Sequence, residues 1–203
     1  MNNTKETCSP YLSEPGGGKV YRHVICKKLS ISQGDVVDYE AYIYEVYLEQ
    51  EITGAINYAG LCNLLRLAER LDTFNFYLAN YGGSCHSLIN LISAVFDSKA
   101  NTVMHVTAPC YSAAATLALC GTGISFCKHS FLMFHNYSSI AHGKGNELLD
   151  HVKNTDKWIK DYMRKLHQPF LTKEECLKIE DDKDIYVSWD DKTLKQRIER
   201  HWK

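Results

Sequence analysis

Residues 74–83 of the chain are Phe74-Asn75-Phe76-Tyr77-Leu78-Ala79-Asn80-Tyr81-Gly82-Gly83. The apolar and aromatic run predicts a short buried strand over residues 74–79, and the glycine pair predicts the turn that ends it. Apolar residues then recur at helical spacing over residues 88–96, which predicts a helix. The same order repeats at once, with a strand predicted over residues 102–107 and a small-residue helix over residues 112–120. This alternation predicts an α/β domain with a largely parallel sheet, whose strand ends hold the chemistry.

Further elements are predicted on both sides of this repeat. The additional predicted strands are residues 35–48, 124–127, 131–134 and 185–187, and the additional predicted helices are residues 56–71, 146–167 and 172–179. Residues 1–19 contain Asn, Ser, Pro and three consecutive glycines with almost no apolar periodicity. We therefore expect residues 1–19 to be a flexible N-terminal segment and residues 20–203 to form a single domain.

Composition and charge exclude several classes of partner. With 203 residues, of which 45% are hydrophobic, the chain can bury one sizeable core. Its 23 basic and 24 acidic residues nearly cancel, so neither nucleic acid nor an anionic membrane surface is an expected partner. The longest apolar runs fall well short of a membrane span, and the polar N-terminus lacks the apolar stretch of a signal peptide. We expect a cytoplasmic protein.

The cysteines and the glycine-rich start indicate neither a metal site nor a nucleotide site. Eight cysteines in a chain of this length are too few for a disulfide scaffold, so free thiols are expected. Cys120, Cys127 and His129 are the nearest approach to a metal cluster, but they form no paired motif and lack a fourth ligand. Gly18-Lys19 is followed by Val20, which does not match a Walker loop. We expect no metal, no cofactor and no ATPase activity in this chain.

Three features fall at predicted turns or strand ends, which is where α/β sheets place their sites: Gly82-Gly83, Ser112 and His135. A serine becomes a nucleophile when a histidine accepts its proton, an acidic group orients that histidine, and paired N–H groups bind the oxyanion. Ser112 lies at a predicted helix start, so its own N–H and that of Ala113 are expected to be free for an oxyanion.

Each feature also has a structural interpretation when it is taken alone. Ser112 could be a helix N-cap, and its surroundings do not match the Gly-x-Ser-x-Gly elbow of α/β-hydrolases. Gly82-Gly83 could be a simple turn, and His135 could be a surface or core histidine. Asp184 lies among several aspartates that could form a solvated turn. Only the combination of these residues, in this order along the chain, points to catalysis.

That order is a glycine pair, a serine, a histidine after an apolar strand, a long helix, and an aspartate before an extended apolar segment. It resembles the Clp-type serine peptidases, the proteolytic subunits of ATP-dependent Clp proteases, over residues 47–188. Residues 76–83 resemble the family's strand ending in Asn-Ser-Pro-Gly-Gly, and residues 112–121 its nucleophile helix. Residues 131–135 resemble its histidine strand, and residues 178–188 its aspartate segment.

The resemblance implies a role for each candidate residue and a quaternary structure. Ser112 would be the nucleophile, His135 the general base and acid, and Asp184 the group that orients the imidazole. Gly83 and Ala113 would donate the N–H groups of the oxyanion hole. The implied fold is α/β, a crotonase-like repeated ββα spiral in which residues 146–167 protrude as a handle helix. The implied assembly is a homo-oligomer of heptameric rings that encloses a chamber, cleaves polypeptide substrates and works with a separate ATP-dependent unfoldase.

Several residues depart from the family pattern, as in a divergent, for instance phage-encoded, member. Tyr81 replaces the usual proline, and Pro109-Cys110-Tyr111 replaces the small residues before the serine, which predicts either a reshaped substrate pocket or a shifted Ser112. Three hypotheses follow. The first is a serine endopeptidase that forms an acyl-enzyme on Ser112, the second is a catalytically inactive scaffold or ring partner with the same fold, and the third is a crotonase-type acyl-CoA enzyme.

Overall fold

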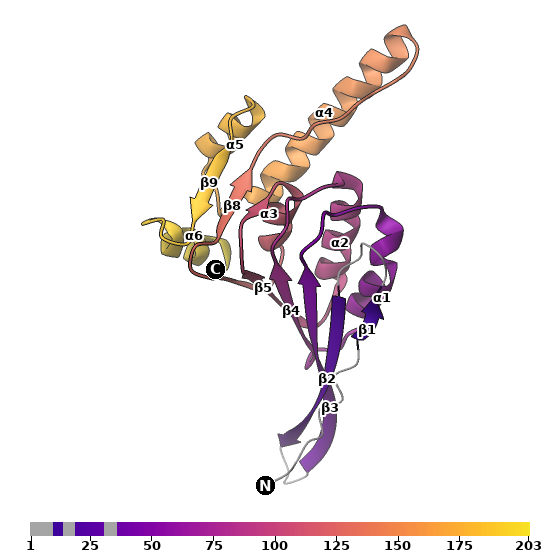
Figure 1. Cartoon of the computed structure of the whole chain (residues 1–203), viewed down its shortest axis with the longest axis vertical. Helices are drawn as coiled ribbons and strands as arrows, with labels where there is room; N and C mark the ends of the chain where they lie inside the picture. The colour runs from indigo at the N-terminus through magenta and orange to yellow at the C-terminus, as the bar shows by residue number, and fades with distance from the viewer. Residues whose placement is uncertain (1–9, 14–18, 31–35) are drawn as a thin grey trace.

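The computed structural model describes residues 10–13, 19–30 and 36–203, which form two β-sheets and the helices packed on them (Figure 1). The larger sheet has the strand order β1-β2-β3-β4-β5-β7 and the smaller one β6-β8-β9. The strands are β1 (Pro10–Ser13), β2 (Lys19–Ser30), β3 (Val36–Leu48), β4 (Thr73–Leu78), β5 (Asn101–Val106), β6 (Cys110–Tyr111), β7 (Gly123–Phe126), β8 (Phe131–Phe134) and β9 (Ile185–Ser188). The helices are the 3-10 turn η1 (Ala55–Tyr58), α1 (Ala59–Leu67), α2 (Cys85–Asp97), α3 (Ala113–Ala118), α4 (Gly145–His167), α5 (Lys173–Glu180) and α6 (Leu194–His201).

The larger sheet holds the core. Strands β3, β4, β5 and β7 run parallel, as predicted, whereas β1, β2 and β3 pair antiparallel. Side chains alternate along β4, where Phe74, Phe76 and Leu78 are fully buried and the residues between them are partly exposed, because successive residues of a strand point to opposite faces. Helices α1, α2 and α3 pack in sequence beside this apolar face (Figure 1).

The smaller sheet stands at the carboxyl end of the larger one. Its strand β6 pairs parallel with β8, and β8 pairs antiparallel with β9. Leu132, Phe134 and Val187 are buried on the inner face of this sheet. The N–H of Tyr111 donates to the carbonyl of Asn80 over 3.1 Å, so β6 is tied directly to the turn after β4. The two sheets therefore meet at the segments that contain the predicted site residues.

Helix α4 projects from the body of the molecule (Figure 1). Its bounds agree with the predicted helix over residues 146–167 to within one residue. The carboxyl-terminal half packs on the core through Ile159 and His167, whereas Leu149 and Val152 in the first half are 56% and 43% exposed. The guanidinium of Arg164 donates two hydrogen bonds of 2.8 Å to the carboxylate of Glu180, which fastens α4 to α5.

Three parts of the chain differ from the sequence predictions. The helix predicted over residues 56–71 ends at Leu67, because the Asp72 carboxylate accepts the N–H of Glu69 over 2.8 Å and draws the chain into a turn. Strands β2 and β6 and helix α6 were not predicted. Most of the predicted flexible segment 1–19 lies outside the described residues, and its described residues 10–13 and 19 belong to strands β1 and β2.

Candidate active site

Ser112 lies in a tight turn between β6 and α3 and has a backbone conformation that L-residues rarely adopt. Its φ is 56° and its ψ is −122°, a combination favoured only by glycine. Ser112 occupies the N-cap position of α3, but its hydroxyl makes no capping hydrogen bond. The interpretation as an ordinary N-cap is therefore wrong, and the hydroxyl is left without the partner that a cap would have.

The expectation that the N–H of Ser112 would be free for an oxyanion is also wrong. This N–H donates to the carbonyl of Met133 over 2.8 Å. The bond joins the serine turn to β8, which is the strand that leads into His135. Ala113, the first residue of α3, lies where helix N–H groups have no partner within the helix. Of the two amides considered at this turn, that of Ala113 is therefore the one that can face a ligand.

Gly82 and Gly83 lie in the turn beside Ser112, and both have positive φ, at 90° and 136°. A Cβ on Gly82 would lie 2.7 Å from the Cβ of Ser112, and a Cβ on Gly83 would collide with the carbonyl oxygen of Ile52. Any larger residue is excluded at both positions, because the contacts are with backbone or with the serine itself.

The N–H of Gly83 is oriented by a parallel β-bridge to Ile52. Ile52 donates to the carbonyl of Gly82 over 2.6 Å and accepts from the N–H of Ser84 over 2.7 Å. Both polar backbone groups of Ile52 are thus used by the residues on either side of Gly83. In such a bridge the intervening residue turns its own N–H to the opposite side, which here is the side of the cavity that Gly83 lines.

His135 follows β8 directly and lines the same cavity as Gly83, Ser112 and Ala113. Along β8 the inward residues Leu132 and Phe134 are buried, so the alternation of the strand directs His135 outward. The cavity has a volume of about 200 Å³. Four of the five residues predicted from the sequence therefore share one cavity.

Asp184, the fifth predicted residue, precedes β9 and is exposed. The antiparallel register pairs Phe134 with Ile185, so one step further along the ladder Asp184 stands opposite His135. In the described part of the chain, no hydrogen bond joins the side chains of Ser112, His135 and Asp184. The backbone thus brings the three residues to one end of the small sheet without a hydrogen bond between their side chains.

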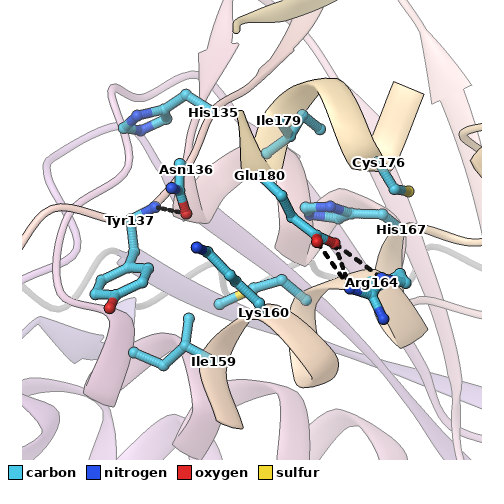
Figure 2. Close-up of a pocket in the computed structure, with 11 residues that line it drawn as sticks. His135, Asn136, Tyr137, Ile159, Lys160, Arg164, His167, Cys176, Ile179 and Glu180 are labelled. Atoms are coloured by element: carbon cyan, nitrogen blue, oxygen red, sulfur yellow. Dashed lines mark hydrogen bonds and ion pairs between the residues drawn. The ribbon is translucent and has the colours of Figure 1, made fainter. Parts of the chain in front are cut away.

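A second, smaller cavity lies behind His135 and has a volume of about 20 Å³, room for roughly one water. Figure 2 shows the imidazole of His135 turned away from the ion pair of Arg164 and Glu180. Asn136, the residue after His135, donates from its side-chain amide to the carboxylate of Asp182 over 2.7 Å. This bond fastens the segment that follows the histidine to the turn that carries Asp184.

The floor of the larger cavity contains a histidine that sequence reasoning missed. His167 is only 4% exposed, and its Nε2 lies 3.0 Å from the hydroxyl of Thr116, which in turn donates to the carbonyl of Ser112 over 3.3 Å. Complete burial lowers the pKa of His167 to about 4, so the imidazole is neutral at pH 7. The sequence signal was the position of His167 four residues after Met163, on the apolar stripe of α4.

Cys85 also lines the larger cavity, beside Gly83 and Ser84. Burial raises the pKa of its thiol, so the thiol is protonated at neutral pH and is a poor nucleophile. Within the described ranges, the structure holds no group of three or more histidine, cysteine, aspartate or glutamate side chains that could bind a metal ion. A search of the same ranges for a helix long and apolar enough to cross a membrane also finds none.

No curated protein matches the chain. The family model for Clp protease matches residues 35–193, which covers the central parallel strands, both walls of the cavity, the projecting helix α4 and the turn with Asp184. The α/β fold predicted from the resemblance is thereby confirmed, and the chain belongs to the Clp protease family.

Proposed function

We propose that the protein is a serine endopeptidase that cleaves polypeptides through an acyl-enzyme on Ser112. The observation that carries the proposal is that the strained Ser112 lines one cavity together with His135 and with Gly83, whose N–H is turned to that cavity. Strained backbone persists where the surrounding structure enforces it, and it concentrates at functional sites. Membership of the Clp protease family supports a peptidase as the class of enzyme.

In the proposed reaction, His135 accepts the hydroxyl proton of Ser112 while the serine oxygen attacks the peptide carbonyl. The N–H groups of Gly83 and Ala113 bind the oxyanion that forms. His135 then gives its proton to the leaving amine, and water hydrolyses the ester on Ser112 by the same proton transfers in reverse order. Asp184 orients the imidazole and stabilises its protonated form, as its place opposite His135 in the ladder would allow.

The alignment of these side chains is proposed to be completed by assembly into homo-oligomeric rings. We infer heptameric rings that stack through α4 and enclose a chamber, with a separate ATP-dependent unfoldase to supply folded substrates. The exposed apolar residues Leu149, Val152 and Trp158 on α4 support an assembly surface there, since large exposed apolar groups commonly mark interaction sites.

An inactive ring partner is the second candidate, because no hydrogen bond joins Ser112, His135 and Asp184 among the described residues. A crotonase-type acyl-CoA enzyme is less favoured. Such enzymes normally use carboxylates, and no aspartate or glutamate of the described chain lines the cavity of about 200 Å³.

Labelling with a fluorophosphonate probe, which reacts with activated serines, tests the proposal. Wild-type protein should be labelled on Ser112, Ser112→Ala should not be labelled, and Ser139→Ala, an exposed serine outside the cavity, should be labelled like wild type. His135→Ala and Asp184→Ala should each lower peptidase activity by a factor of about 10³ or more, since such residues act as a unit. An unlabelled, fully assembled wild-type particle would instead establish the inactive ring partner.

A further inference from the structure

The outer face of the smaller sheet carries aromatic side chains next to the proposed reacting residues. The register places Tyr111 of β6 opposite Met133 of β8, and Met133 opposite Tyr186 of β9. The neighbouring residues Leu132 and Val187 are buried on the inner face. The alternation of side chains along each strand therefore turns Tyr111, Met133 and Tyr186 outward. His135 belongs to this same outer face, because it follows Met133 by two residues.

These side chains form a continuous surface. The rings of Tyr81 and Tyr111 stack at 5.2 Å, Tyr111 meets Phe131 edge to face at 5.3 Å, and Phe131 lies 5.8 Å from Tyr186. Tyr81 is 80% and Tyr186 57% exposed. Tyr81, Tyr111, Phe131, Met133 and Tyr186 are here called the aromatic face. Their mutual contacts hold the rings in place, so little side-chain freedom remains to be lost when a ligand binds.

The aromatic face is continuous with the proposed site. Tyr111 directly precedes Ser112, and Tyr81 directly precedes the glycine pair at Gly82. Met133 lies two residues before His135 on β8, and Tyr186 lies two residues after Asp184, in β9. Each separation is about 7 Å along the strand. An extended peptide advances about 3.3 Å per residue, so a substrate held at Ser112 would place a side chain on the aromatic face two or three residues from the scissile bond.

We propose that the aromatic face binds aromatic and large aliphatic side chains of the polypeptide substrate, two or three residues from the cleaved bond. The inference rests on the proposed function and specifies its substrate class. The aromatic face contains no charged residue, so it offers no partner to an acidic or basic side chain. A second copy of the chain is the other possible occupant; the positions of Tyr111 directly before Ser112 and of Tyr81 directly before Gly82 favour the substrate.

Cleavage of casein, an unstructured protein that needs no unfolding, tests the inference. Cleavage sites of the wild-type protein are mapped by mass spectrometry and compared with those of Tyr81→Ser and Tyr186→Ser. In the wild type, Phe, Tyr, Trp, Leu, Ile and Met should be enriched two or three residues from the cleaved bond on one side. Each variant should lose this enrichment, and for a peptide with Phe at that position each should raise KM about 5- to 10-fold while leaving kcat nearly unchanged.

Phe96→Ser is the matched control, because Phe96 is 61% exposed and lies about 12 Å along α2 from Leu88, the nearest residue of that helix that lines the cavity. This variant should keep the wild-type cleavage sites. If Tyr81→Ser and Tyr186→Ser are labelled on Ser112 but also keep those sites, the inference is overturned. A fall in particle mass in either variant would overturn it as well, since the aromatic face would then join copies of the chain. Failure of the wild type to label on Ser112 would instead reject the proposed function.

Discussion

Replacing Ser112 by glycine is expected to make the folded chain more stable while it removes the proposed nucleophile. The serine has a φ of 56° and a ψ of −122°, and a non-glycine residue in such a region costs on the order of 1–3 kcal/mol. Glycine relieves this strain but loses about 0.5–1 kcal/mol through the greater freedom of the unfolded chain. The hydroxyl makes no capping bond whose loss would oppose the gain. The net expectation is a stabilisation of about 1 kcal/mol.

Urea unfolding of Ser112→Gly and Ser112→Ala at equal protein concentration measures this difference, because alanine removes the hydroxyl but keeps the strain. With a typical denaturant slope of about 2 kcal/mol per molar urea, the midpoint of the glycine variant should lie about 0.5 M above that of the alanine variant. Both variants should lack peptidase activity. If the glycine variant unfolds at the same urea concentration as the alanine variant, or at a lower one, Ser112 is not strained and its backbone does not support a catalytic role.

Two further predictions concern the wall and the floor of the cavity. Gly83→Ala should abolish probe labelling of Ser112 and destabilise the fold by about 1 kcal/mol or more, because the new Cβ collides with the Ile52 carbonyl; wild-type labelling of this variant would disprove the close approach. The pKa of His167 is lowered to about 4 from 6.5, so below pH 6.5 the unfolded chain binds more protons than the folded one. Stability should therefore fall between pH 6.5 and 4, by up to about 3 kcal/mol from this residue. Urea unfolding across this range should show a shallower pH dependence for His167→Gln, and identical slopes would contradict the assignment.

Much of the fold was predictable because its elements have clear periodicities. Strands β4, β5 and β8 and helix α4 agree with the predicted ranges to within one residue at each end. Strand β6 was not predictable, since two residues carry no period and their pairing depends on the distant β8. Helix α6 has few apolar residues, and it is held by two hydrogen bonds of 2.8 and 2.7 Å from Arg197 to Glu175 of α5. No local pattern in the sequence of α6 predicts this contact with Glu175.

The candidate site also contains residues that the sequence could predict and contacts that it could not. Gly83, Ser112 and His135 were identifiable because each falls where a predicted element begins or ends, and the structure places all three in one cavity. The bond from the Ser112 N–H to Met133 could not be foreseen, because it joins two elements whose adjacency exists only in the folded chain. His167 was missed for a related reason. A histidine on an apolar helical stripe is indistinguishable from a core residue until the neighbouring Thr116 is known to contact it.

Backbone hydrogen bonds position most of the proposed reacting groups, and the side chains of Asn80 and Asn136 add one bond each, to Gly82 and to Asp182. The Ser112 turn is fixed by the Met133 carbonyl, and Gly83 by the two bonds that Ile52 makes on either side of it. Asp184 is placed by the ladder between β8 and β9. None of these bonds depends on which side chain stands at position 81 or 111. The residues that would contact substrate can therefore change without displacing the reacting groups, which explains how a chain can carry two tyrosines beside its proposed nucleophile and still keep the fold of its family.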